Sequence, residues 1–171
     1  PRISYYDGGG EKYSMDAVSF IADKHPELFF DIYTTKSPLA PTSRYIQFKK
    51  EAPSNVRIFE FNVPDEFRYL YNIEPGTLRY RWDIESYYFA NILLRKLGSE
   101  IKPDLIWAYY LMDFPFTAGI PTVLNLLGYP REKVQYREAL LSQYSKIVAI
   151  STNVVHKWND VLDISIKEYE V

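Results

Sequence analysis

The sequence predicts an α/β protein whose mostly parallel sheet is doubly wound in a three-layer domain. Apolar runs of strand length alternate along the chain with longer amphipathic stretches, and the runs are almost continuously apolar. Strands that are buried on both faces of a parallel sheet have this character. Alternating strands and helices are joined by right-handed crossovers, which build a doubly wound sheet. Residues 1–171 are therefore expected to form one domain around a single sheet of about six or seven strands.

Six apolar runs are the predicted strands. They are Ile3–Tyr6, Phe29–Thr34, Arg57–Phe61, Leu105–Tyr109, Thr122–Leu127 and Lys146–Ile150. The predicted helices cover Tyr13–Lys24, Asp83–Leu97, the more polar Arg131–Tyr144 and a stretch after Ser151. Apolar residues recur in them at helical spacing. Ser151 or Thr152 is the expected N-cap of the last helix, because a hydroxyl there accepts a hydrogen bond from the first turn.

The composition excludes some kinds of function. The chain has 20 basic and 22 acidic residues, so its net charge of −2 gives no reason to expect a nucleic-acid partner. It has no cysteine and two histidines, which excludes disulfides and thiolate chemistry and argues against a metal site. No apolar run approaches the ~20 residues that a membrane-spanning helix needs, and no segment reads as a signal peptide. We therefore expect a soluble, cytoplasmic protein without a metal.

The segment Gly8-Gly9-Gly10-Glu11-Lys12 is the most informative candidate site. It stands between the first predicted strand and the first predicted helix. Glycines let the backbone approach a ligand closely, and the amide groups at a helix N-terminus attract an anion. Ligands of doubly wound sheets bind at the carboxyl ends of the strands, where this segment falls. It predicts a phosphate-binding loop. A plain tight turn is the alternative, because the GxGxxG pattern is not matched.

The stretch Pro64–Trp82 interrupts the alternation of strands and helices. It is too long for an ordinary connection, and it carries Arg68, Arg79, Arg81 and Trp82 among tyrosines. Arginine pairs with phosphate, and aromatic rings stack on sugars or lie at a membrane interface. We interpret the stretch as a surface for an acceptor or for peripheral membrane contact. The alternative is an excursion whose tyrosines cap the edge of the sheet.

Four short motifs occur in order over nearly the whole chain. They are Gly8-Gly9-Gly10-Glu11-Lys12, Lys102-Pro103-Asp104-Leu105-Ile106-Trp107, Gly119-Ile120-Pro121-Thr122-Val123 and Ser145-Lys146-Ile147-Val148-Ala149-Ile150-Ser151. They resemble, in the same order, Gly-Gly-Ala-Glu-Arg, Lys-Pro-Asp-Val-Ile-His, Gly-Ile-Pro-Val-Val and Ala-Asp-Lys-Ile-Ile-Ala-Val-Ser of the amino-terminal domain of GT-B glycosyltransferases. The resemblance is to the large retaining family of glycogen and mannosyl transferases. Each motif is unspecific alone, and the likeness rests on all four together.

The resemblance implies a Rossmann-like half of an enzyme that transfers a sugar, with retention, from a nucleotide sugar to a sugar or lipid-linked acceptor. In the family this domain holds the acceptor, its glycine loop approaches the donor diphosphate, and a carboxy-terminal domain binds the nucleotide sugar. That second domain is absent from this chain, so residues 1–171 are expected to fold but to be inactive alone. The donor is a substrate, so no cofactor is expected. The expected partners are the donor, the acceptor and the missing domain.

One departure from the family concerns a histidine that many relatives have close to the reacting sugar. Here the run reads Asn125-Leu126-Leu127-Gly128-Tyr129-Pro130, so the position falls on Leu127 or Gly128. The resemblance makes Asn125, Gly128 and Tyr129 acceptor candidates. Asp113 is a fourth, with a helix N-cap as its alternative role. Because the donor phosphate itself is thought to act as the base, the retaining mechanism tolerates this departure, and no catalytic residue is assigned.

Two other functions stay open at this point. One is a sugar-nucleotide epimerase of the same architecture, and the other is a non-catalytic glycan-binding module, which the missing histidine favours. A nicotinamide-binding domain is disfavoured. The expected acidic residue at the end of the second strand is absent, because that position reads Thr34-Thr35-Lys36.

Overall fold

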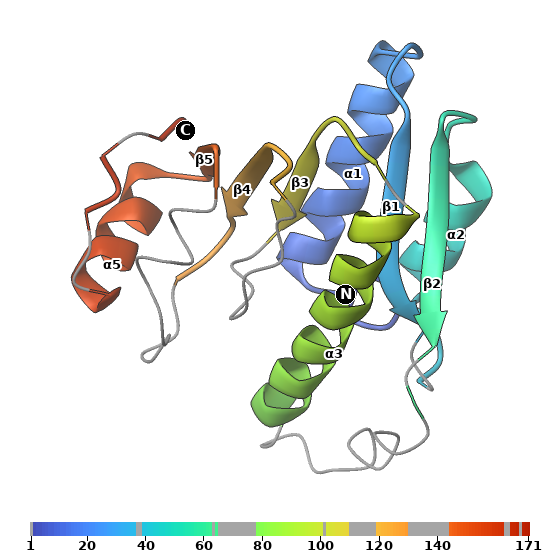
Figure 1. Ribbon diagram of the computed structural model, residues 1–171, viewed down its shortest axis with the longest axis horizontal. Helices are drawn as coiled ribbons and strands as arrows, with labels where there is room; N and C mark the ends of the chain where they lie inside the picture. Colours follow the sequence, from blue (N-terminus) through green and yellow to red (C-terminus); the bar gives the residue numbers. More distant parts are fainter. Residues whose placement is uncertain are drawn as a thin grey trace. The chain divides into compact units, whose positions relative to one another are not determined.

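The computed structural model describes residues 2–36, 39–62, 64, 78–100, 102–109, 119–129, 144–162, 165–167 and 169–171, with the backbone alone at 78–84, 87, 98 and 162. The chain divides into two compact units, Pro1–Glu85 and Ser86–Val171. Each unit has its own parallel sheet (Figure 1). Helix α3 (Leu78–Ser99) runs across the division. Within the described residues the protein is thus α/β, with parallel sheets of two and three strands.

The first unit is built on a β–α–β crossover. Strand β1 (Phe30–Lys36) is followed by helix α2 (Ser43–Glu51) and strand β2 (Val56–Asn62), and the strands pair in parallel from Phe30↔Val56 to Lys36↔Asn62. Helix α1 (Gly9–Lys24) precedes β1. Thr42 starts α2, because its hydroxyl accepts a hydrogen bond from the Tyr45 amide at 3.2 Å.

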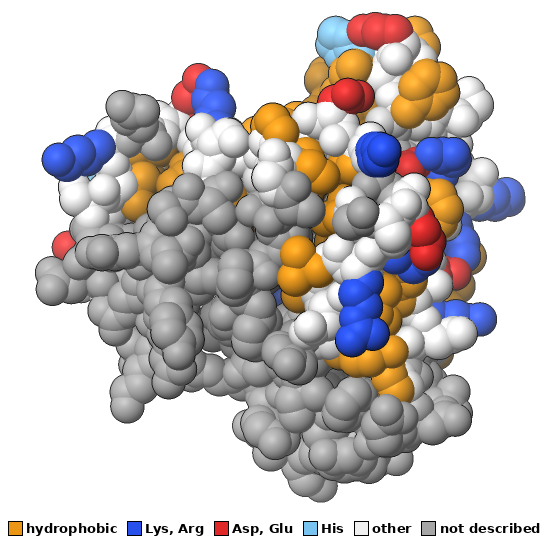
Figure 2. Space-filling model, viewed as in Figure 1, with side chains coloured by type: hydrophobic (Ala, Val, Ile, Leu, Met, Phe, Trp, Pro, Cys, Tyr) orange, Lys and Arg blue, Asp and Glu red, His pale blue; other side chains and the backbone are white. Residues whose placement is uncertain are grey.

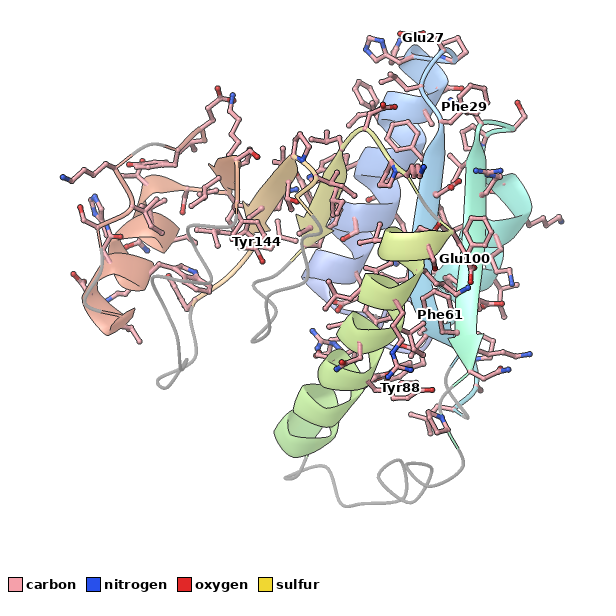
Figure 3. The ribbon with its side chains drawn as sticks, in the orientation of Figure 1. Glu27, Phe29, Phe61, Tyr88, Glu100 and Tyr144 are labelled. Carbon is pink, nitrogen blue, oxygen red and sulfur yellow. The ribbon has the colours of Figure 1, made fainter. Side chains whose placement is uncertain are left out.

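One face of this two-stranded sheet carries the core of the first unit. Met15 of α1 and Tyr45 and Phe48 of α2 are buried there, packed with Ile3, Ile32, Val56 and Ile58. Ile32 and Ile58 are register partners and share a face. Their neighbours in sequence therefore point the other way, where the Tyr33 ring stacks on Phe59 with centroids 5.0 Å apart and on Phe61 at 5.8 Å. Figure 3 labels Phe61 on β2.

Asn55 fastens the end of α1 to the start of β2. Its side-chain amide nitrogen lies 3.1 Å from the Ala22 carbonyl, 3.3 Å from that of His25 and 2.7 Å from that of Leu28. The Asn55 carbonyl accepts from the Phe30 amide at 2.9 Å. The last carbonyls of a helix have no partner within the helix. One buried side chain thus satisfies the C-terminal end of α1 and the turn that leads into β1.

The second unit holds three parallel strands in the order β3-β4-β5. They are β3 (Ile106–Tyr109), β4 (Thr122–Leu126) and β5 (Lys146–Ala149), and helix α5 (Thr152–Leu162) follows. The buried apolar residues of these elements and of α3 are Phe89, Ala90, Leu93, Leu97, Ala108, Leu124, Leu126, Ala149, Val154, Val155 and Trp158. Ser151 caps α5, since its hydroxyl accepts from the Val154 amide at 3.3 Å. This confirms one of the two predicted caps.

Five of the six predicted strands are confirmed to within two residues at their ends. The prediction at Ile3–Tyr6 is wrong, because residues 3–5 form a turn. The amides of Tyr5 and Tyr6 both donate to the Arg2 carbonyl, at 3.2 and 3.1 Å, so this backbone bonds to itself instead of running along a strand.

The predicted helices are only partly right. Helix α2 was not predicted, although Thr42 and the spacing of Tyr45 and Phe48 signal it. Helix α1 starts at Gly9 instead of Tyr13, and α3 starts at Leu78 instead of Asp83. The last turns of the stretch Pro64–Trp82 are therefore helical. The predicted helix Arg131–Tyr144 lies outside the described residues apart from Tyr144. None of the described helices is long and apolar enough to cross a membrane.

Glu60 of β2 links the sheet to α2. The Tyr45 hydroxyl donates to one Glu60 oxygen at 2.7 Å and the Lys49 ammonium to the other at 2.9 Å. Partial burial by itself raises the pKa of Glu60, but the hydrogen bonds from Lys49 and Tyr45 outweigh it, so this pKa lies below its ordinary value. Burial, and then the bond to Glu60, raises the pKa of Tyr45.

We expect Glu60→Gln to reduce the dependence of stability on pH. The ionised carboxylate stabilises the fold above its unfolded-state pKa of 4.5, and this contribution is lost as the pH falls through the lower folded-state pKa. The variant should lose about 0.5–1 kcal/mol at pH 7 and show a flatter profile between pH about 5 and 3. Urea denaturation at several pH values measures both, with the exposed Glu51→Gln as control. If Glu60→Gln kept the wild-type dependence of stability on pH, the stabilising role of the ionised Glu60 carboxylate would be contradicted.

Candidate functional site

The glycine segment forms the start of α1. Gly8 is the N-cap, with φ −97° and ψ 169°, and Gly9 and Gly10 are the first two helical residues. The predicted free loop is thus wrong in detail, because only Gly8 lies outside the helix. No side chain caps this end through a hydrogen bond. The structure places the free backbone amides of a helix N-terminus at Gly9 and Gly10.

Hydrogen bonds hold this end of α1 beside the carboxyl end of β1. The Ser4 hydroxyl donates to the Thr35 carbonyl at 2.7 Å, and the Thr42 amide donates to the Ser4 carbonyl at 3.0 Å. The Arg44 guanidinium donates to Asp7 at 2.9 Å. The start of α1, the start of α2 and the end of β1 therefore meet at one edge of the sheet. Ligands of parallel α/β sheets bind at this kind of edge.

Glu11 supplies a negative charge inside this edge. It is the third helical residue, 4% exposed, and its carboxylate lies 3.7 Å from the Arg2 Nε. A Cβ atom on Gly8 would lie 2.4 Å from Glu11 Oε2, so the carboxylate folds back over the N-cap. A carboxylate here interacts favourably with the positive end of the helix. The Glu11 carboxylate therefore weakens the attraction of the α1 N-terminus for an external anion. The Arg2 guanidinium beside it offsets the negative charge of Glu11.

Gly9 is the open position of the segment. It is exposed, and a Cβ atom built on it would meet no atom within 4 Å. Lys12 is exposed one turn further along. The Tyr5 hydroxyl donates to the buried carboxylate of Glu85, which lies two turns into α3. Arg2 and Glu85 were not predicted as site residues. No local pattern signals these two residues, because their role depends on contacts between distant parts of the chain.

A second group of predicted residues lies at the carboxyl edge of the three-stranded sheet. Asn125 is the penultimate residue of β4 and is 2% exposed. Its register partners are Tyr109, the last residue of β3, and Val148 of β5. Asn125 Nδ2 is buried and has no hydrogen-bond partner. A buried polar side chain in this state is exceptional among native proteins.

Gly128 and Tyr129 are tied to α5. The Trp158 indole donates to the Gly128 carbonyl at 2.8 Å, and the Asn153 side-chain amide donates to the Tyr129 hydroxyl at 3.1 Å. The Tyr129 side chain is otherwise 65% exposed. A Cβ atom on Gly128 would meet nothing within 4 Å. The loop after β4 is therefore held by side chains of α5, and Tyr129 remains accessible to a ligand.

The side chains of the remaining predicted site residues are not described by the structure. Asp113 and Arg68 lie outside the described residues. Arg79, Arg81 and Trp82 belong to the first turns of α3, where the backbone alone is described. Figure 2 shows basic and acidic side chains interspersed over the described part of the face in view. In the part of the chain that the structure describes, no group of three or more His, Asp or Glu residues could hold a metal.

The structure thus brings the predicted residues together in two sets. Gly8, Gly9, Gly10, Glu11 and Lys12 lie in the first unit, and Asn125, Gly128 and Tyr129 lie in the second. Each set is at the carboxyl edge of its own parallel sheet. Comparison with protein-family models, with curated proteins and with solved structures found no match for this chain. The family resemblance therefore stays a prediction.

Proposed function

We propose that this chain is the amino-terminal, acceptor-side domain of a retaining GT-B glycosyltransferase. One observation carries the proposal. The first turn of α1 has an exposed glycine, Gly9, with open space at its Cβ position, and it lies at the carboxyl edge of a parallel β–α–β unit. A diphosphate can approach the helix amides at such a position without meeting a side chain.

The places of the other motifs support the same function. Lys102-Pro103-Asp104 ends one residue before β3, and Gly119-Ile120-Pro121 directly precedes β4. Gly119 has φ +72°, a conformation that favours glycine. The motif that begins at Ser145 runs through β5 to the cap of α5. All three motifs therefore accompany strands of a parallel sheet, as the resemblance requires.

The chemistry follows from these positions. In the proposed reaction the bond between the anomeric carbon and the diphosphate oxygen breaks while the acceptor hydroxyl oxygen bonds to the same face of that carbon. The acceptor proton passes to the departing phosphate, and a nucleoside diphosphate is released. The amides at Gly9 and Gly10 and the Lys12 ammonium stabilise the charge that develops on the diphosphate. Glu11 is too tightly buried beside Arg2 to serve as a mobile base.

The test compares the gene product that carries this chain with residues 1–171 alone. With a panel of uridine and guanosine diphosphate sugars and with sugar or lipid-linked acceptors, we expect the gene product to form a glycoside with retained anomeric configuration. Nuclear magnetic resonance of the product reads the configuration. We expect residues 1–171 to fold, to show no turnover, and to bind nucleotide sugars more weakly than about 1 μM by calorimetry, because affinity falls when half of the contacts are missing.

Each contrary result points elsewhere. An inverted product contradicts the retaining assignment, and turnover or sub-micromolar binding by residues 1–171 alone contradicts the two-domain requirement. Conversion of the donor to an epimeric sugar nucleotide without transfer indicates the epimerase. Glycan binding by a gene product that turns over none of the donors indicates the non-catalytic module.

A further inference from the structure

The side-chain amide nitrogen of Asn125 is buried and has no hydrogen-bond partner in the structure. The side chain is 2% exposed, and its Nδ2 has neither a hydrogen bond within the structure nor access to solvent. An amide nitrogen carries two donor protons. Leaving them unsatisfied in the interior lowers stability, whereas an apolar side chain of similar size would not. A group that costs stability at a candidate site is often retained for function.

The position of Asn125 indicates where a partner would bind. Register places Tyr109 and Val148 on either side of it and on the same face of the sheet. Trp107, two residues before Tyr109, shares that face, and its ring centroid is 5.1 Å from that of Tyr109. The hydrogen-bond donor of Asn125 therefore lies at the carboxyl edge of β4, beside aromatic side chains of β3. Aromatic faces next to a hydrogen-bond donor are suited to the mixed apolar and polar surface of a sugar ring.

The charges on this face indicate a neutral ligand. Among the described residues of the three strands, the charged side chain on the same face is Lys146, the register partner of Val123. It stands at the amino end of β5, and its ammonium is bonded to Glu170 at 2.6 Å. At the carboxyl end of this face, the described strand residues thus offer the Asn125 amide as a hydrogen-bond donor and no charged side chain. None of the described residues of these strands therefore supplies a charge that would pair with a phosphate, a carboxylate or a cation at this point.

We propose that Asn125 donates a hydrogen bond to a neutral hydroxyl or carbonyl oxygen of a sugar, bound at the carboxyl edge of β4. This inference rests on the proposed function for the class of ligand. It assigns to this edge the uncharged part of a substrate, and it makes Asn125 a specificity-determining residue. A sugar that lacks the oxygen facing Asn125 would leave the amide unpaired and would be rejected.

The first test follows the side-chain amide itself. The NH₂ resonances of Asn125, assigned by their loss in Asn125→Leu, are recorded while residues 1–171 are titrated with methyl α-glucoside, methyl α-mannoside and N-acetylglucosamine. We expect a saturable shift of these resonances with at least one sugar and none with sodium phosphate. The exposed Asn62 of β2 serves as the reference amide. Unmoved Asn125 resonances with all three sugars would overturn the inference.

The second test uses the stability of the free protein. Asn125→Leu removes the unpaired donor, so we expect its melting temperature to rise by about 2–4 °C. We also expect its affinity for the responding sugar to fall at least tenfold. Asn62→Leu should change neither quantity. A lower melting temperature for Asn125→Leu would show that the amide has a structural partner, and the inference would fail. If Asn125→Leu does not fold, the resonances are assigned by sequential experiments and the titration alone decides.

The outcomes separate this inference from the proposed function. If the gene product transfers sugar and Asn125→Leu leaves the KM for donor and acceptor unchanged, the inference fails and the transferase stands. If the Asn125 resonances respond to a sugar but no donor is turned over, the sugar site stands and the transferase fails.

Discussion

Replacement of Asn55 with alanine is expected to lower the free energy of unfolding by about 2–4 kcal/mol. The Asn55 amide nitrogen lies within 3.3 Å of the carbonyls of Ala22, His25 and Leu28, and the side chain is buried at 7% exposure. Alanine would leave these carbonyls at the end of α1 without that donor and open a small void. The removal of one partner from a buried hydrogen-bonded group costs more than the bond itself contributed.

Chemical denaturation of residues 1–171 measures this effect. Ser54→Ala, a truncation at the exposed neighbouring position, should change stability by less than about 0.5 kcal/mol. Asn55→Asp keeps the shape but replaces the donors with a carboxylate near the negative end of a helix, so it should be at least as destabilising as alanine. A loss below about 1 kcal/mol in Asn55→Ala would contradict the role of this side chain in joining α1 to β2.

Replacement of Gly9 with valine is expected to lower the proposed transferase activity of the gene product about 100-fold while leaving the fold intact. The Cβ of residue 9 points into open space, so the protein itself accommodates a side chain there. A bound diphosphate would meet that side chain at the N-terminus of α1. Displacement of a reacting group by about 1 Å can cost a factor of about 100 in rate. Stability should change by no more than about 0.5 kcal/mol.

Two further variants control for this result. Asp16→Val places the same side chain at an exposed position further along α1 and should leave activity unchanged. Gly8→Ala, unlike Gly9→Val, would create a clash within the protein. The new Cβ would lie 2.4 Å from Glu11 Oε2 and 2.6 Å from a Tyr6 ring atom, so these side chains would have to move. Gly8→Ala should lower both stability and activity. Unchanged kinetics in Gly9→Val would make the glycine segment a simple helix start.

Five strands could be predicted from the sequence because each is a short apolar run with a local signal. The crossover from β1 through α2 to β2 follows from the parallel pairing of such runs, even though α2 itself was missed. Its amphipathic face consists of little more than Tyr45 and Phe48. The segment Ile3–Tyr6 has the same local signal as the confirmed strands. It forms a turn because its backbone groups bond to Arg2 and Thr42, while the Ser4 hydroxyl donates to the Thr35 carbonyl.

The candidate site was predicted in part for the same reason. Glycines ahead of an amphipathic helix are visible in the sequence, but the predicted strand Ile3–Tyr6 before them is a turn, so the position of the α1 N-terminus beside β1 comes from the structure. Asn125 was an acceptor candidate through the family resemblance alone, and the structure adds that its side-chain amide nitrogen is buried and unpaired. Arg2 and Glu85 could not be predicted. Tyr5 and Glu85 are 80 residues apart in the sequence, and no local pattern connects them.

By itself, the sequence determined the α/β class, most of the strands and the presence of glycines just ahead of the first predicted helix. These depend on the spacing of apolar residues and glycines within a few turns of chain, where burial and backbone freedom act locally. The tertiary structure decided which buried polar groups have partners. It pairs Glu11 with Arg2, Glu60 with Tyr45 and Lys49, and Asn55 with the end of α1, and it leaves Asn125 unpaired. The physical reason is that a buried hydrogen bond depends on the meeting of distant segments, which composition and periodicity do not encode.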